Sequence, residues 1–235
     1  MLIIVSPEIL INQLKRDSVT IAESFDRLCS EDICVISALL AQASAITFSG
    51  LHAKGRNNKE LQTWSVEMLI NISNSLSAAV LVLRAGYLLT PGVILRNAVE
   101  AMAVCIHGLQ CPQDLQKIKD GSFNTPIAVS TANKVILPFG QMYGLLSKQF
   151  THISSLHQSI KPLRPYEAGE PGLALNLKIL RAVMWLHYVV VEFAFIDLLD
   201  QPRYWHWEPP NKAIYKPSTE EQAWQREFLN GRGNA

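Results

Sequence analysis

Charged residues are scarce in this chain. Only 17% of its 235 residues are Asp, Glu, Lys or Arg, and the formal net charge is +1, whereas an average soluble domain has about 25% charged residues. The near-neutral balance argues against a protein that coats nucleic acid through bulk electrostatics. Because 49% of the residues are apolar, the composition excludes a disordered chain and predicts a large buried core or a surface shared with a partner.

The common sequence signatures of chemistry are also missing. The four cysteines form no C-x-x-C pair, and no Cys/His cluster has the spacing of a structural zinc site. No G-x-S-x-G, G-x-x-x-x-G-K-[ST], G-x-G-x-x-G or H-E-x-x-H pattern is present, so the signatures of serine hydrolases, P-loop proteins, dinucleotide-binding folds and zinc peptidases are absent. We therefore expect reduced thiols in a cytoplasmic protein that holds no metal and no cofactor.

One apolar stretch is long enough to cross a bilayer. Ile33–Ala53 contains 21 residues without a charge, and about 20 apolar residues span a membrane. Six polar side chains interrupt it, however, and alanine fills many of the other positions. The N-terminus has no basic region and meets Glu8 early, which is a poor match to a signal peptide. We expect a buried helix here and no stable membrane insertion.

Helix signals dominate the rest of the sequence. Ser6-Pro7, Thr90-Pro91 and Thr125-Pro126 each place an N-capping residue before a proline at the first helical position, and Ser30 is another candidate N-cap. Pro138 predicts a kink or a break. Helices are predicted over 6–28, 31–53, 58–89, 91–109, 112–119, 126–152 and 172–200.

These helices predict an all-α fold. Long helices joined by short connections give a single bundle of about six or seven helices over residues 1–202. Residues 203–235 form an aromatic-rich C-terminal tail, with a short helix near 219–230 that follows Ser218 as its N-cap. We expect this tail to pack on the bundle or on a partner subunit. Low charge and the aromatic tail together predict a homodimer packed through long helices.

A polar stripe marks the helix predicted over 91–109. Arg96 and Glu100 are its only charged residues from Val93 onward, and helical spacing places them and His107 along one face. A helix apolar nearly all round is buried, and buried charges need partners. The stripe is therefore either an ion pair in the core or the lining of a pocket.

Two further groups of polar residues are candidate sites. Tyr143 and Ser147 share a helical face, with His152 downstream, and we expect them near Arg96 and Glu100. Arg181 and His187 fit the Arg-x(4–6)-His pattern of HEPN ribonucleases, in which an imidazole moves a proton and a cation stabilises the phosphorane. The alternative is a capped core histidine beside a surface arginine.

Three segments resemble a group of bacterial all-helical proteins similar to the HEPN superfamily. They are Ala78–Gly86, the Leu-Arg-x-x-x-Glu motif within Ile94–Glu100, and the Tyr-x-x-Leu-Ser…His segment Tyr143–His152, so the resemblance covers about residues 70–155. It implies that the polar residues of the last two segments face one another across the core. The superfamily includes toxin and phage-defence ribonucleases, although active members usually carry a polar residue where Ala182 stands.

Two functions follow as hypotheses. The first is a non-catalytic helical module that binds a partner protein or a small ligand, with the residues around Arg96 and Glu100 forming a polar core cluster. The second is a metal-independent HEPN-like ribonuclease with Arg181 and His187 as its catalytic pair, acting on RNA. The sequence leaves both open.

Overall fold

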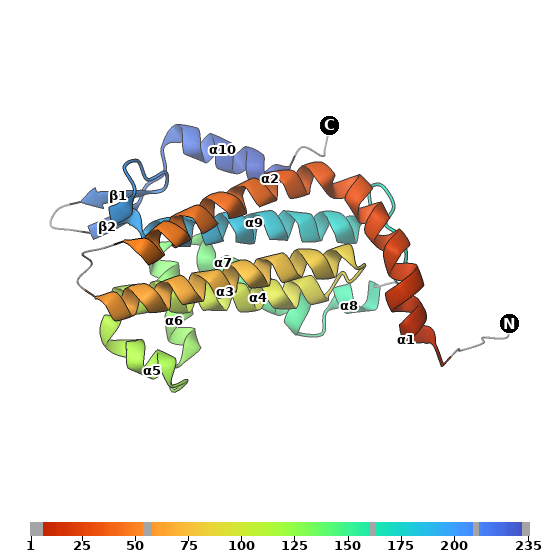
Figure 1. The fold of residues 1–235 in the computed structure, drawn as a ribbon, viewed down its shortest axis with the longest axis horizontal. Helices are drawn as coiled ribbons and strands as arrows, with labels where there is room; N and C mark the ends of the chain where they lie inside the picture. The colour runs from red at the N-terminus through yellow and green to blue at the C-terminus, as the bar shows by residue number, and fades with distance from the viewer. Residues whose placement is uncertain (1–6, 54–57, 160–162, 209–211, 232–235) are drawn as a thin grey trace.

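The computed structural model describes residues 7–53, 58–159, 163–208 and 212–231, and most of this part is helical (Figure 1). The elements are α1 (Ile9–Asn12), the π-helix η1 (Gln13–Asp17), α2 (Ser18–His52), α3 (Lys59–Arg84), α4 (Thr90–Gln110), the 3-10 helix η2 (Pro112–Asp114), α5 (Leu115–Lys119), α6 (Thr125–Val135), α7 (Pro138–Leu146), the π-helix η3 (Ser147–Thr151), α8 (Ser155–Ser159), α9 (Pro171–Ala194), the 3-10 helix η4 (Ile196–Leu198), β1 (Trp205–Glu208), β2 (Lys212–Tyr215) and α10 (Thr219–Asn230). The predicted all-α class is confirmed in its main feature, and a small hairpin is added to it.

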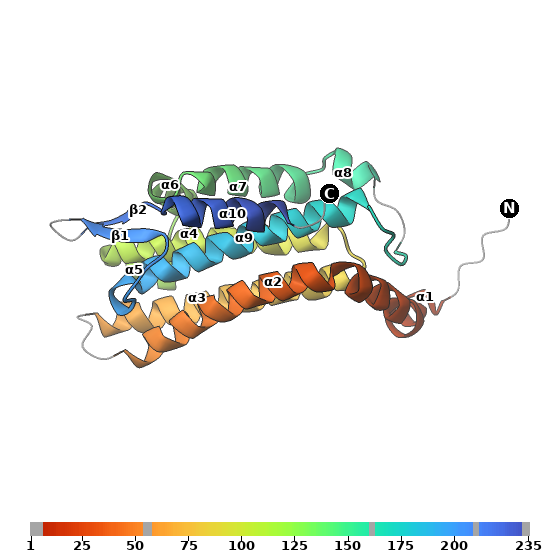
Figure 2. The ribbon, with the colours of Figure 1, turned by 90° about the horizontal axis from the view of Figure 1, so that it is seen from above.

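The long helices form three layers (Figure 2). α2 and α3 lie side by side in one outer layer, and α4 and α9 form the middle layer beneath them. α6 and α7 cover the far side of α4, and α10 packs on α9. One large cluster of buried apolar residues runs between the layers, and its fully buried members include Leu69, Val99, Met102 and Val190. The middle layer is therefore enclosed from both sides.

Several helix boundaries differ from the predictions. The predicted break at Ser30 is wrong, because α2 runs without interruption from Ser18 to His52 and no proline or glycine stops it before Gly50. The predicted break at Pro138 is confirmed, since α6 ends at Val135 and α7 starts at Pro138. α9 ends at Ala194, six residues before its predicted end at position 200, and a 3-10 turn follows.

The predicted serine and threonine caps have a mixed outcome. Thr90 and Thr125 are the first helical residues of α4 and α6 and make no capping hydrogen bond, because the preceding residue is the N-cap and proline occupies the first turn. Ser6 lies outside the described residues. Ser218 does cap α10, since its Oγ accepts a hydrogen bond of 3.1 Å from Glu221 N, and α10 spans the predicted range 219–230.

The C-terminal tail packs on the bundle. β1 and β2 pair antiparallel, with Trp205 opposite Tyr215, although no strand is predicted from the sequence. Tyr204 and Trp205 are fully buried, and Trp205 Nε1 donates to Val189 O of α9 at 2.8 Å. The hairpin forms here because these two aromatic side chains are inserted into the core, which fixes the chain on either side of them.

The predictions of a cytoplasmic location and of no stable membrane insertion are wrong. Among the described residues, four helical regions are long and apolar enough to cross a membrane: Ile9–His52, α3, α4 and α9. The polar side chains within Ile33–Ala53 do not rule out a membrane span, because a span tolerates small polar residues more readily than charges. The apolar windows of α9 and α4 are 72% and 56% buried, whereas those of the Ile9–His52 region and α3 are only 28% and 33% buried.

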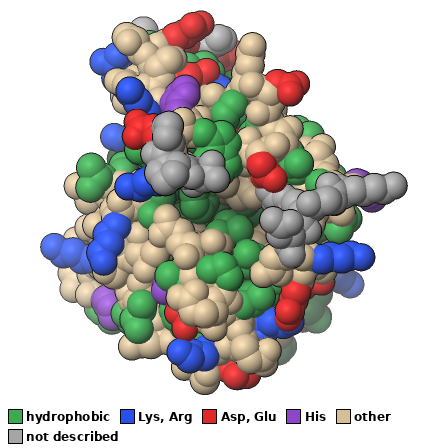
Figure 3. Space-filling model, turned by 90° about the vertical axis from the view of Figure 1, so that its left-hand side faces the viewer, with side chains coloured by type: hydrophobic (Ala, Val, Ile, Leu, Met, Phe, Trp, Pro, Cys, Tyr) green, Lys and Arg blue, Asp and Glu red, His purple; other side chains and the backbone are tan. Residues whose placement is uncertain are grey.

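The outer layer and the hairpin therefore expose apolar side chains. At the end of the bundle that carries the hairpin, hydrophobic side chains gather near the middle of the face, and charged ones lie mostly around its rim (Figure 3). Phe48 and Leu51, near the end of α2, are 51% and 45% exposed, and Trp207 of β1 is 52% exposed. The structure is of a single chain, so the homodimer stays a prediction.

Candidate functional site

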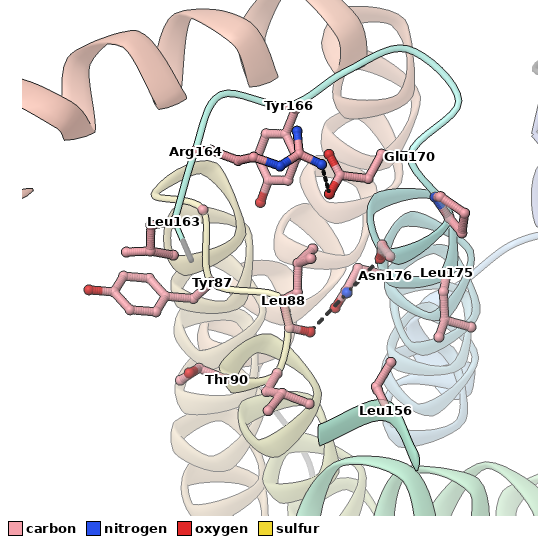
Figure 4. A pocket seen from close by; sticks show the side chains of 14 residues that line it. Tyr87, Leu88, Thr90, Leu156, Leu163, Arg164, Tyr166, Glu170, Leu175 and Asn176 are labelled. Atoms are coloured by element: carbon pink, nitrogen blue, oxygen red, sulfur yellow. Dashed lines mark hydrogen bonds and ion pairs between the residues drawn. The ribbon is translucent and has the colours of Figure 1, made fainter. Parts of the chain in front are cut away.

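A pocket of about 490 Å³ opens at the end of the bundle opposite the hairpin (Figure 4). Its walls come from the turn between α3 and α4, the loop before α9, the first turns of α9, and Leu156 of α8. Leucine side chains from each of these segments line it, with Tyr87, Tyr166 and Pro171. Volume and lining are those of a site for a small molecule, since such sites usually enclose about 300–1,000 Å³ and are mainly apolar.

Local sequence features shape this pocket. Gly86 ends α3 with φ +97°, a conformation that glycine adopts without strain, and its N–H donates to Leu83 O at 2.9 Å. Pro171 occupies the first turn of α9, where a proline is well tolerated. Gly172 lets α9 approach the α3–α4 turn, because a Cβ there would lie 2.9 Å from Leu88 Cδ1.

Asn176 joins two walls of the pocket (Figure 4). Its Nδ2 donates to Leu88 O at 3.0 Å and to Gly172 O at 2.8 Å. The residue is 2% exposed, and its Oδ1 has no hydrogen-bond partner within the described part of the chain. A buried acceptor without a partner carries a desolvation cost of about 1–3 kcal/mol, which a hydrogen-bond donor placed beside this oxygen would remove.

The loop before α9 supplies the other polar groups. Tyr166 Oη donates to Leu83 O at 2.6 Å and its N–H donates to Ser24 Oγ at 2.8 Å, and burial raises the pKa of the phenol above its ordinary value. Arg164 pairs with Glu170 at 3.3 Å (Figure 4). The Tyr166 contacts hold the loop against α2 and α3, and the ion pair is a polar group at the edge of an apolar pocket.

The predicted polar core cluster assembles in part. Arg96 is paired with Glu100, and its guanidinium donates to Tyr143 Oη and lies 4.9 Å from the centre of that ring. The side chains of Arg96 and Glu100 are 25% and 22% exposed, so the pair is less buried than expected. It lies on the middle helix α4 and reaches α7, which suits a role in holding these helices together.

Three other predicted members of this cluster lie apart from the pair or make no bond to it. Ser147 Oγ is buried, with no hydrogen-bond partner inside the described segments. His152 is exposed, because the π-helical turn η3 ends at Thr151 and the chain becomes extended. His107 is 4% exposed and bonds to Thr131 and Asp114. On a helical projection His107 falls on the same face as Arg96. The end of α4 has other neighbours, however, so His107 bonds to Thr131 and Asp114 instead.

The candidate catalytic residues Arg181 and His187 face different elements. Arg181 pairs with Asp32 of α2 and donates to Phe228 O of α10 at 3.0 Å. His187 is fully buried, and its Nε2 lies 2.9 Å from Ser73 Oγ of α3. Ser73 Oγ itself donates to Leu69 O, so His187 Nε2 carries the proton that it shares with Ser73. Burial disfavours the charged imidazolium, and this single chain gives RNA no access to the ring.

Aromatic and basic groups of the tail are occupied by contacts within the chain. The guanidinium of Arg203 lies 4.5 Å from the Trp224 ring centre and bonds to Glu221 at 2.7 Å. Desolvation alone would lower the pKa of Arg203, but the bond to Glu221 and neighbouring charges raise it above its ordinary value. No observation favours stacking of these groups on bases, and RNA binding stays a prediction.

A group with metal-ligating atoms lies at the other end of α4 from the pocket. The imidazole of His107, the thiol of Cys111 and the carboxylate of Asp114 lie within 4.8 Å of one another. Neither Cys111 nor Asp114 was predicted, because the residues around them match neither a C-x-x-C pair nor the spacing of a structural zinc site. The spacing of four and then three residues at the end of a helix is the signal that was available. Asn176 was not predicted either, because it has no motif around it.

Comparison with known proteins adds no relative. No family model, no curated protein and no solved structure matches this chain. The HEPN resemblance therefore stays a prediction from three short segments.

Proposed function

We propose that this chain is a non-catalytic helical module, HEPN-like in class, that binds a small and largely apolar ligand in the pocket at the start of α9. The ligand carries one hydrogen-bond donor. The observation that carries the proposal is the pocket of about 490 Å³ that Asn176 lines, with the unpartnered Oδ1 of that residue.

The chemistry of the lining supports this ligand class. Leucine and tyrosine side chains favour an apolar body through burial, worth about 25 cal/mol for each Å² removed from water. Asn176 Oδ1 accepts hydrogen bonds, as does the carboxylate of Glu170, whereas Arg164 is already engaged by carboxylates. A donor group such as an N–H or O–H on an apolar ring therefore fits better than an anion.

Arg181 and His187 give no comparable support to the ribonuclease hypothesis. They point to different neighbours, and His187 is fully buried. General acid–base catalysis needs a group within hydrogen-bond reach of the substrate, and nothing in the described arrangement provides this.

Calorimetric titration with indole and with indene, its analogue without the N–H, tests the proposal. We expect saturable 1:1 binding of indole and weaker binding of indene. Leu175→Trp should fill the pocket and abolish both, whereas Leu145→Trp on α7 should change neither, because the two leucines are similarly exposed at 37% and 42% and only the first lines the pocket. Indole binding that survives Leu175→Trp, or no saturable binding to the wild-type chain, would contradict the proposal.

A further inference from the structure

We propose that His107, Cys111 and Asp114 form a zinc site at the C-terminal end of α4. His107 belongs to the last turn of α4, Cys111 directly follows the helix, and Asp114 ends the 3-10 turn η2. The site is separate from the ligand pocket, because Thr90 of the pocket and His107 lie near opposite ends of α4, about 25 Å apart along the helix.

The hydrogen bonds of His107 define which ring nitrogen is available. Thr131 Oγ1 donates its one proton to Ile127 O at 3.0 Å. When it does so, it accepts from His107 Nδ1–H, which lies 3.0 Å away. In the neutral imidazole this leaves a lone pair on Nε2. Metal-bound histidines usually have this arrangement, with the second ring nitrogen donating to a fixed oxygen.

The available nitrogen faces a carboxylate rather than a donor. His107 Nε2 lies 3.1 Å from Asp114 Oδ2, a distance at which the two atoms either share a proton or bind one cation. A metal ion bound to both atoms takes the place of the shared proton. The second carboxylate oxygen, Asp114 Oδ1, accepts from Lys117 Nζ at 3.0 Å, which orients the carboxylate and leaves Oδ2 free for the metal.

Ligand types and burial favour zinc. One nitrogen, one thiolate sulfur and one carboxylate oxygen are ligands that Zn²⁺ accepts, and three protein ligands leave a fourth position for water. Tetrahedral Zn²⁺ holds such atoms roughly 3.3–3.5 Å apart. The three atoms lie within 4.8 Å of one another, so metal binding requires them to draw together by about 1 Å. His107 is held in place by burial and by its ring contact with Phe123, with ring centres 4.7 Å apart.

Metal titration of chelator-treated full-length protein tests this site. We expect one Zn²⁺ per chain by calorimetry, and a Co²⁺-loaded protein with a tetrahedral visible spectrum and a thiolate-to-cobalt charge-transfer band. Cys111→Ser should remove the charge-transfer band, and Thr131→Val should weaken metal binding by about 10–100-fold. The matched control is Cys34→Ser, which changes an exposed free cysteine on α2 and should leave both signals intact.

Two results would overturn the site. One is the absence of stoichiometric Zn²⁺ binding by wild-type protein whose circular dichroism shows it folded. The other is a Co²⁺ spectrum that Cys111→Ser leaves unchanged or that Cys34→Ser abolishes. Circular dichroism of each variant separates loss of ligation from loss of fold, and neither result bears on the ligand pocket.

Discussion

The two halves of α9 differ in what surrounds them. Its first turns, from Pro171 to Asn176, border an open pocket, whereas nearly every residue from Ile179 to Ala194 is buried. The sequence motif that suggested catalysis, Arg181 with His187, lies in this second half, where His187 is fully buried and Arg181 borders a separate pocket beside Asp32. Asn176, which no motif marks, lies in the open half. Residue type alone therefore does not locate a site on this helix, because the packing of its neighbours decides which residues a ligand can reach.

The two halves of α9 should differ most in how much stability the protein loses when a charge is introduced into each. Val190 is fully buried, so Val190→Asp places an unpaired carboxylate in the core and should cost about 4 kcal/mol or more, enough to abolish cooperative unfolding. Leu175→Asp, at a position 37% exposed, should keep a helical spectrum and a cooperative melt. Thermal melts by circular dichroism compare the two. A wild-type melting temperature for Val190→Asp would show that the second half is not sealed.

A smaller effect is expected where the second half of α9 holds the tail. Glu192 Oε1 accepts from Tyr204 N at 2.7 Å and from Trp205 N at 3.3 Å. Glu192→Leu leaves both buried N–H groups unpaired and should cost about 2–5 kcal/mol, with faster proteolysis after residue 203. Glu192→Gln keeps an accepting oxygen and should be milder. Equal proteolysis of the two variants would mean that these bonds do not attach the tail.

A still smaller effect is expected at the bond between His187 and Ser73. Ser73→Ala leaves His187 Nε2–H without its partner and should cost about 1–2 kcal/mol, measured by urea denaturation. Ser77→Ala is the control, because Ser77 bonds only to the backbone of its own helix at an exposed position. A cost no larger than that of the control would show that the imidazole is not held in the core.

The half-buried pair of Arg96 and Glu100 gives an intermediate case outside α9. A fully buried pair loses about 3–5 kcal/mol when one partner is removed, and a surface pair loses about 0–1 kcal/mol. Since both side chains are about a quarter exposed, we expect Glu100→Gln to cost about 1–2 kcal/mol by the same urea assay. A cost of 3 kcal/mol or more would favour the largely buried pair that the sequence predicted.

The sequence predicts what depends on local signals. The all-α class, the break at Pro138 and the helix over 219–230 with its Ser218 cap all follow from short patterns of residues. The pairing of Arg96 with Glu100 follows in the same way, because the two residues are one helical turn apart.

Features that depend on distant contacts were not predictable from one sequence. The pocket requires Asn176 to bond to Leu88, 88 residues earlier. The hairpin requires Trp205 to be buried against α9, and His107 needs Thr131 of α6 and Phe123 of the loop before it. The exposed apolar surface of the outer layer is also a tertiary property, since hydropathy does not reveal which helices the fold leaves uncovered.

The measurement that tests the proposed function most directly is a titration of ¹⁵N-labelled protein with indole, followed by amide chemical shifts. We expect saturable shifts that cluster at residues 86–90, 163–166 and 170–176, with the amides around His187 and Val190 unchanged, because only the first half of α9 borders the pocket. Shifts centred on the second half of α9, or no saturable shifts at the pocket, would contradict the proposed function.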